Sequence, residues 1–549
     1  MAQEIELPAL PKLGTMKHFL FLCAVVFSVA PAFGGRPNVL VAVSDDQSFP
    51  HASAYGDPVI RTPGFDEVAR NGMRFDNAFT PAPGCSPMRA AFLTGKYIWE
   101  IGAAGTHASH FSTDLKTFPN VLRDSGYSVG YTGKPWGPGK FQISGWKENP
   151  AGPSYNSKKL DAPKGISATD YFSNFKDFLS EKEKDKPFCF WFGGHEPHRS
   201  FGKGLGKRSG MSPSEVVVPG FLPDAPEVRE DLLDYYYEIQ WFDNHLSRMI
   251  EHLREIGELD NTLVVVTSDN GMSFPRAKAN LYEYGIHMPL AISLPNRFPK
   301  QQATDALVNL IDVTATIYDV CGVKPQMKIS GRSLAGVLSG ESAATWDAAF
   351  SGRERHSSSR WNSLGYPCRC VRTKDYLYIK NYAPERWPAG TPQKYAQARY
   401  DEEGTLVEST LGPAHGGYHD IDACPTLSFM IQNRTDPNVG PLFELSVGKR
   451  PAEELYDIRS DSACLRNLVG LDSHATVLQQ MRERLSRKLT STGDLRETDY
   501  RASHVWEQYP RYSSLRWFPK PEWAGSDHSI PRQDWLEQRR PRVSKKKER

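Results

Sequence analysis

Four short apolar segments, each followed directly by polar side chains, constrain the fold of this chain more than any other feature. Their residues are hydrophobic at successive positions and rich in Val and Phe, which is typical of strands buried on both faces of a parallel sheet. Segments with a helical pattern alternate with them, at residues 64–71, 115–126, 168–180 and 230–256. This alternation predicts a doubly wound α/β domain with a mostly parallel sheet. The expected strands are residues 38–43, 128–133, 188–192 and 263–267.

The polar residues after these strands are expected to gather at one edge of the sheet, where the carboxyl ends of parallel strands meet. Asp45-Asp46 follows the first strand and Asp269-Asn270 the last, while Lys134 and His195 follow the other two. Carboxylate and amide oxygens are hard ligands that suit Ca²⁺ or Mg²⁺ better than Zn²⁺. Either pair alone, Asp-Asp or Asp-Asn, is an ordinary turn at the end of a strand. Two such pairs on separate parallel strands favour a metal site.

A cysteine that precedes an expected helix lies between these two acidic pairs in the sequence. Pro87 suits the first turn of a helix, where its missing N–H group costs nothing, and the following residues continue a helical pattern. A helix N-terminus favours negative charge, and Arg89, one turn on, can point back toward Cys85. The motif therefore predicts a site for an anion or a developing oxyanion. A buried free cysteine before a helix is the alternative, because five-residue patterns also recur by chance.

Taken together, these motifs resemble those of the type I sulfatases of the alkaline phosphatase superfamily. The likeness covers residues 36–470. It implies a large, mostly parallel sheet domain of the alkaline phosphatase type and a smaller C-terminal α+β domain with an antiparallel sheet. The motifs that carry it occur in the order found in the family, namely Asp45-Asp46, Cys85-Ser86-Pro87-Met88-Arg89, Leu93-Thr94-Gly95, Gly133-Lys134, His195, Asp269-Asn270-Gly271 and the late element Glu454-Leu455-Tyr456-Asp457.

The resemblance also implies a chemistry. In that family the cysteine is oxidised after synthesis to formylglycine, so Cys85 would become an aldehyde whose hydrate is the nucleophile, and His195 would protonate the leaving atom. A cysteine here, rather than threonine or serine, argues against a phosphohydrolase of the same superfamily. The implied cofactor is Ca²⁺, with Mg²⁺ as the alternative. The implied metal ligands are Asp45, Asp46, Cys85 as formylglycine, Asp269 and Asn270, and the implied catalytic cations are Arg89, Lys134 and Lys278.

One position departs from the family pattern. Many relatives carry a histidine two positions after the catalytic lysine, where it contacts the hydrate and can serve as a base. This chain has Trp136 there, and an indole cannot accept a proton. Either another group such as His107 or His110 reaches the nucleophile, or the elimination step is slower in this protein.

Within the sulfatases, several segments resemble the heparan N-sulfatases, also called sulfamidases. The segments are residues 195–199, 268–275, 278–282 and 331–334. The resemblance implies N-sulfoglucosamine ends of heparan-like chains as the substrate, although those enzymes carry an arginine where this chain has Lys278. The loop Arg353-Glu354-Arg355-His356 could contact a sugar, or could be an exposed charged turn. An O-sulfatase for another sulfated polysaccharide remains an alternative, as does a non-catalytic sulfoglycan-binding protein with an unmodified Cys85.

The remaining expectations concern organisation and location. Residues 1–32 read as a signal peptide, with a possible start at Met16, so the mature chain is expected to be secreted or periplasmic. The catalytic domain is expected over 36–340, a smaller domain over 341–490, with a hairpin at 371–380 and a helix at 474–489, and a wrapping or partly disordered basic tail over 491–549. A net charge of +2 gives no argument for nucleic acid or an anionic membrane. The expected partners are a sulfated carbohydrate and an enzyme that generates formylglycine.

Overall fold

The computed structural model describes residues 35–300, 303–525 and 533–542. The described residues from Arg36 onward belong to one compact unit. The expected signal peptide at residues 1–32 lies outside the described residues, so that prediction and the secreted or periplasmic location stay predictions. None of the described helices is both long enough and apolar enough to cross a lipid bilayer.

A seven-stranded sheet organises the larger part of the chain, and the four strands that the sequence predicted follow one another from one edge of it to its middle. β3, β4, β1 and β5 are neighbours and run parallel, which confirms the predicted doubly wound class. β6 runs antiparallel to both β5 and β2, whereas β2 and β7 are parallel to each other. In sheet order the strands are β3 Ser128–Gly133, β4 Phe188–Gly193, β1 Asn38–Ser44, β5 Thr262–Ser268, β6 His287–Ser293, β2 Met73–Phe79 and β7 Ala303–Asn309.

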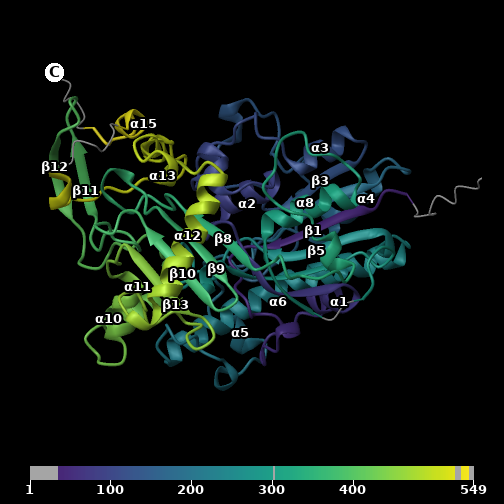
Figure 1. Ribbon diagram of the computed structural model, residues 1–549, viewed down its shortest axis with the longest axis horizontal. Coiled ribbons are helices and arrows are strands. Elements are labelled where there is room, and N and C mark those ends of the chain that lie inside the picture. The colour runs from purple at the N-terminus through teal and green to yellow at the C-terminus, as the bar shows by residue number, and fades with distance from the viewer. Residues whose placement is uncertain (1–34, 301–302, 526–532, 543–549) are drawn as a thin grey trace, which may run out of the picture. The chain divides into compact units, whose positions relative to one another are not determined.

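Helices cover both faces of this sheet, as its continuous apolar strands require. Alternate side chains of β1 take part in two different cores: Val41 packs in the core that includes α2 and α8, and Leu40 in the core that includes α1, α4 and α6. Figure 1 shows α3 and α8 on one side of β1 and β5, with α1 and α6 on the other. The helices are α1 Pro63–Asn71, α2 Cys85–Thr94, α3 Phe118–Asp124, α4 Tyr171–Glu181, α6 Pro226–Glu255 and α8 Leu310–Val320.

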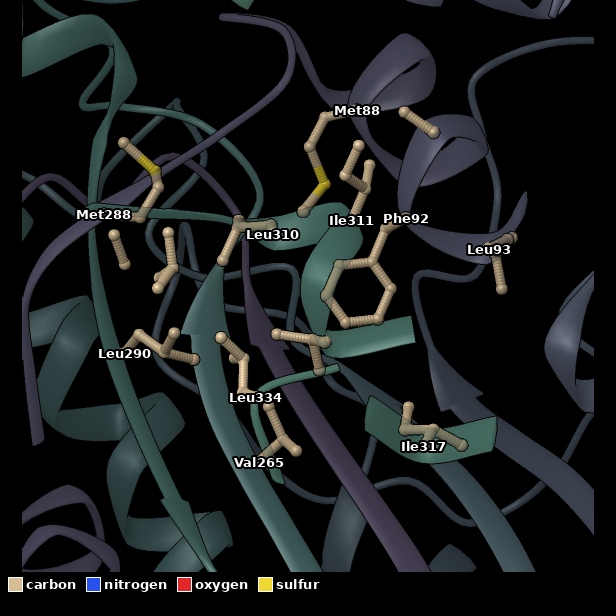
Figure 2. Packing of buried hydrophobic residues seen from close by; sticks show 14 of the residues in the cluster. Met88, Phe92, Leu93, Val265, Met288, Leu290, Leu310, Ile311, Ile317 and Leu334 are labelled. Atoms are coloured by element: carbon tan, nitrogen blue, oxygen red, sulfur yellow. The ribbon is translucent and has the colours of Figure 1, made fainter. Parts of the chain in front are cut away.

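Helix α2 is fixed rigidly over the sheet because all ten of its residues are buried. Met88 and Phe92 of α2 point toward Leu310 and Ile311 at the start of α8, close to the apolar side chains of the sheet (Figure 2). The helix ends at Gly95, whose φ of 69° is left-handed and whose N–H donates to the Ala91 carbonyl over 2.8 Å. This packing holds the N-terminal end of α2 in place at the edge of the sheet.

A second, antiparallel sheet of four strands follows the first, in the order β13-β10-β9-β8. The predicted hairpin is confirmed as β9 and β10, and the predicted helix as α12, which packs on both of them. The bounds are β8 Ala348–Arg353, β9 Cys368–Thr373, β10 Tyr376–Asn381, β13 Glu453–Asp457 and α12 Ala475–Ser491, with a separate hairpin of β11 Tyr395–Tyr400 and β12 Leu406–Leu411. The shorter helices are α5 Leu205–Arg208, α7 Glu283–Ile286, α9 Ala335–Leu338, α10 Pro425–Gln432, α11 Gly440–Val447, α13 Leu495–Thr498, α14 Val505–Gln508 and α15 Asp534–Glu537.

The C-terminal segment, residues 494–525, is joined to the rest of the unit by buried ion pairs. Asp494 contacts Arg369 over 2.6 Å, and Arg496 contacts Glu354 over 2.7 Å. Because separating a buried ion pair leaves an uncompensated charge away from water, these contacts disfavour displacement of the segment. The domain boundaries suggested by the sequence, including the character of the tail, stay predictions.

Candidate active site

The acidic residues that follow β1 and β5 lie together because these strands are parallel neighbours in register. Ser44 pairs with Ser268, which places the next residues of both strands side by side. One carboxylate oxygen from each of Asp45, Asp46 and Asp269 lies within 4.8 Å of the others, and all three side chains are buried. The backbone N–H of Asp46 donates to Asp269 Oδ1 over 3.1 Å. The predicted cluster therefore exists, in a turn where Asp46 adopts a left-handed φ of 75°.

The oxygens of this cluster fit a hard divalent cation. Asp45 Oδ1 and Asn270 Oδ1 are buried without a hydrogen-bond partner in the described structure. The Asn270 amide nitrogen donates to Asp46 Oδ1 over 2.8 Å, which leaves the amide oxygen as the free donor atom for a metal. Burial, followed by the charge of Asp45, raises the pKa of Asp269 to about 7. Unpartnered buried oxygens and a destabilised carboxylate are what a bound Ca²⁺ or Mg²⁺ would relieve.

Each acid of the cluster also contacts one of the predicted basic residues. Arg89 Nε lies 2.8 Å from Asp269 Oδ2, and both side chains are fully buried. Lys134 forms an ion pair with Asp45. Burial opposes the charge on Asp45, but the neighbouring cations, Lys134 first, outweigh this and lower its pKa. The structure thus brings the predicted bases and acids together at one edge of the sheet.

Lys278 connects the cluster to a residue that the sequence analysis missed. Its Nζ lies 2.6 Å from Asp46 Oδ2 and 3.0 Å from Asp422 Oδ2. Whereas Lys278 is buried, the Asp422 side chain is 35% exposed, so it lies where the site opens toward solvent. His198 is nearby, with its Nε2 3.9 Å from Asp46 Oδ2. No local pattern marks Asp422, because it precedes α10 and reaches the site only through the fold.

Two glycines allow the strand ends that carry Lys134 and His195 to approach each other. Gly133 has a φ of 76°, and a Cβ on it would lie 1.9 Å from the Gly193 carbonyl oxygen. That carbonyl accepts a hydrogen bond from the Lys134 N–H over 2.7 Å. A glycine is therefore required here by both conformation and space. The contact fixes where the Lys134 side chain leaves β3.

His195 follows β4 as predicted and has an exposed side chain. Its backbone N–H donates to the Tyr171 hydroxyl over 3.1 Å. Desolvation by the surrounding protein, followed by the charge of Lys134, lowers the pKa of His195 to about 4. The imidazole is thus neutral at pH 7, and a bound anion would raise its pKa and favour the protonated form.

Cys85 is the first residue of α2, and its buried thiol faces a histidine. Gly84 is the N-cap, and the Met88 N–H donates to the Gly84 carbonyl over 3.1 Å. Cys85 Sγ lies 3.3 Å from His107 Nε2, while burial raises the pKa of the thiol. Of the two histidines proposed to compensate for Trp136, it is His107 that contacts the thiol.

Trp136 has a structural contact in place of a proton-transfer role. Its Nε1–H donates to the Ser86 carbonyl over 3.1 Å, and its ring packs edge-on against Phe111. The Ser86 hydroxyl in turn accepts from the N–H of Ala108, directly after His107, over 3.0 Å. The indole therefore braces the first turn of α2, and the same turn anchors the loop that carries His107.

The loop Arg353-Glu354-Arg355-His356 is buried, which contradicts the exposed charged turn, while contact with a sugar stays a prediction. Arg353 contacts Asp420 over 2.5 Å, and Glu354 contacts Arg369 over 2.8 Å. The ring of His356 lies 4.6 Å from that of His107. The loop is therefore not an exposed turn, and its first two side chains are engaged inside the protein. Their charged partners lie far away in the sequence, which is why the local charge pattern was misleading.

Comparison with known families gives two matches. The family model described as Sulfatase matches residues 37–323, which is more than half of the chain. The model described as N-sulphoglucosamine sulphohydrolase, C-terminal, matches residues 276–389.

Among characterised proteins, the chain is 28% identical to human N-sulphoglucosamine sulphohydrolase over 517 residues, covering 86% of this chain and 94% of that protein. It is 27% identical to an N-acetylglucosamine-6-O-sulfatase of Bacteroides thetaiotaomicron over 449 residues, covering 63% of this chain and 79% of that protein. A solved structure in complex with its substrate D-glucosamine-2-N,6-O-disulfate aligns with a TM-score of 0.57 at 20% identity, covering 84% of this chain and 99% of that one. The last comparison supports the fold alone.

Proposed function

The chain belongs to the sulfatase family, and from this premise we propose that it hydrolyses the sulfamate bond of N-sulfoglucosamine at the ends of heparan-like chains. As a sulfatase it is a hydrolase of sulfated glycans. The finer substrate assignment is supported by the C-terminal family match, which includes Lys278, and by the 28% identity to the human enzyme. The observation that carries the proposal is the placement of the Cys85 side chain next to His107, at the sheet edge that also holds the buried acid cluster.

We further propose that Cys85 is converted to formylglycine and that Asp45, Asp46, Asp269 and Asn270, with residue 85, bind Ca²⁺. The cation would polarise a sulfate oxygen and lower the pKa of the hydrate. The formylglycine hydrate would supply one oxygen for attack on sulfur and a second hydroxyl for the later expulsion of sulfate. The role of the cation requires a site with oxygen ligands for a divalent ion, and the unpartnered oxygens of Asp45 and Asn270 support such a site.

The other residues of the site have separate tasks in this proposal. Arg89, Lys134 and Lys278 place positive charge around the position of the sulfuryl group, in a site from which water is largely excluded, so their effect is strong. His195, at the exposed rim, is placed to give a proton to the leaving nitrogen as the S–N bond breaks. Asp422, also at the rim, is placed to accept a hydrogen bond from the sugar next to the sulfated group.

Two alternatives remain. The 27% identity to an N-acetylglucosamine-6-O-sulfatase supports the first alternative, cleavage of an O-sulfate. If Cys85 stays a thiol, the same pocket of cations and acids would bind a sulfated glycan without cleaving it. The proposed secretion or periplasmic export rests on residues 1–32 alone.

Peptide mass spectrometry and sulfate release test these proposals. In protein from a host that makes formylglycine, we expect conversion of Cys85, whereas Cys189, which is also buried and unpaired, should stay a thiol. We then expect sulfate release from N-sulfoglucosamine and none from 6-O-sulfated N-acetylglucosamine. The Cys85→Ala variant should release no sulfate from either. The opposite substrate preference would support the O-sulfatase, and an unmodified Cys85 would contradict catalysis.

A further inference from the structure

We propose that Arg511, in the C-terminal segment, is a positioning residue that fixes the tautomer of His107 and thereby directs a ring N–H at the side chain of residue 85. The proposal rests on the proposed function, since it assigns His107 a task at the same nucleophile. Arg511 lies beyond both family matches, which end at residues 323 and 389. It was not among the site residues expected from the sequence.

The tautomer follows from the partners of the two ring nitrogens. Arg511 Nη1 lies 3.1 Å from His107 Nδ1. A guanidinium has donors only, so Nδ1 must accept this hydrogen bond and can carry no proton. The ring proton of the neutral imidazole is then on Nε2, and Nε2 lies 3.3 Å from Cys85 Sγ. His107 is therefore oriented as a donor toward whatever atom residue 85 presents.

Arg511 is held in the position that this role requires. Its side chain is buried, with 4% exposed, and Nη1 also donates to the His356 carbonyl over 2.9 Å. The next residue, Tyr512, donates its N–H to the Ala108 carbonyl over 2.7 Å. The C-terminal segment and the His107 loop are thus bonded both through a side chain and through the backbone.

This tautomer has a consequence for the position of Trp136, where many relatives carry a histidine. With its lone pair directed at Arg511, His107 cannot accept a proton from the nucleophile in this state. Instead, its Nε2–H can stabilise negative charge on an oxygen of residue 85, as preorganised donors do at other oxyanions. His107 therefore occupies the neighbourhood of the nucleophile as the relatives' histidine does, but as a donor rather than as a base.

Nitrogen NMR of the full chain labelled with ¹⁵N-histidine tests this directly. The His107→Gln variant identifies the His107 signals, and in the wild type we expect a protonated Nε2 and an unprotonated Nδ1. In Arg511→Met the preference should be lost, and Arg511→Lys, which restores a donor, should recover it. Arg516→Met is the matched control, because Arg516 lies in the same segment and its backbone hydrogen bonds to Ser358 do not depend on its side chain.

A proton on Nδ1 in the wild type would overturn the proposal even if Arg511→Met did not fold. An unchanged His107 signal pattern in a folded Arg511→Met would do the same. This experiment requires no substrate, so it is independent of whether the sulfamate assignment is correct. Where sulfate release can be measured, we expect Arg511→Met to lower kcat about 10- to 100-fold with little change in KM. A raised KM with unchanged kcat would instead assign Arg511 to substrate binding and contradict the positioning role.

Discussion

The raised pKa of Asp269 predicts that the proposed calcium binding weakens as the pH falls below 7. A carboxylate must lose its proton to coordinate a metal, so a proton on Asp269 competes with the ion. Because burial and the charge of Asp45 raise this pKa to about 7, Asp269 is mostly ionised at pH 8 and mostly protonated at pH 6. The expected ratio of the two dissociation constants is about tenfold, or ~1.4 kcal/mol.

Isothermal titration calorimetry of the calcium-free chain, in buffers with different ionisation enthalpies, measures both the dissociation constant and the number of protons released. We expect release of about 0.9 proton per ion at pH 6 and about 0.1 at pH 8. The unfolded carboxylate has a pKa near 3.8, so ionised Asp269 destabilises the calcium-free protein progressively as the pH rises from that value toward 7. Calcium should therefore raise the Tm more at pH 8 than at pH 6.

Two variants make the test specific. Asp243 also has a pKa raised to about 7, by burial, but it accepts hydrogen bonds from Gly64 and Phe65 in α1. Asp243→Asn should leave the tenfold pH dependence of calcium affinity intact. Asp269→Asn should bind calcium weakly, and its affinity should not depend on pH in this way. Equal affinities of the wild type at pH 6 and pH 8, with no proton released, would refute the reasoning. A pH dependence that survives in Asp269→Asn would assign it to a group other than Asp269.

Three further variants have defined outcomes. Gly133→Ala should lower the free energy of unfolding by at least about 2 kcal/mol, because residue 133 has a left-handed φ and lies against the Gly193 carbonyl. Denaturant titration measures this loss, and Gly525→Ala, with open space around it, is the control. Trp136→Phe should cost about 1–2 kcal/mol in the same assay but leave kcat for sulfate release within about threefold, and a larger loss of kcat would contradict its bracing role. Asp422→Asn should raise KM about tenfold with kcat unchanged, whereas an unchanged KM would exclude substrate contact.

The sequence predicted the parts of the fold that are encoded locally. The runs that became β1, β3, β4 and β5 are apolar at successive positions, and each is followed by polar residues at a parallel edge. The antiparallel direction of β6 was not predictable in this way, because apolar periodicity carries no information on strand direction. The acid cluster was predictable because adjacent parallel strands end at the same place.

The residues that the sequence analysis missed reach the site from far along the chain. Asp422 lies 144 positions from Lys278, and Arg511 lies 404 positions from His107. Neither stands in a motif, and each becomes recognisable only when the contact is seen. The burial of the loop at residues 353–356 was not predictable for the same reason, since its partners Asp420 and Arg496 lie elsewhere in the sequence.

The burial of Cys85 has a consequence for the order of events during biosynthesis. With 1% of its surface exposed, the thiol cannot enter the active site of a second enzyme once the fold is complete. Position 85 leaves the ribosome more than four hundred residues before Arg511, and segments synthesised first are available first. For the proposed conversion of Cys85, an oxidising enzyme would therefore have a time window that closes when the C-terminal segment emerges and docks beside His107. Slowing translation of residues 494–525 should therefore increase the fraction of chains that mature.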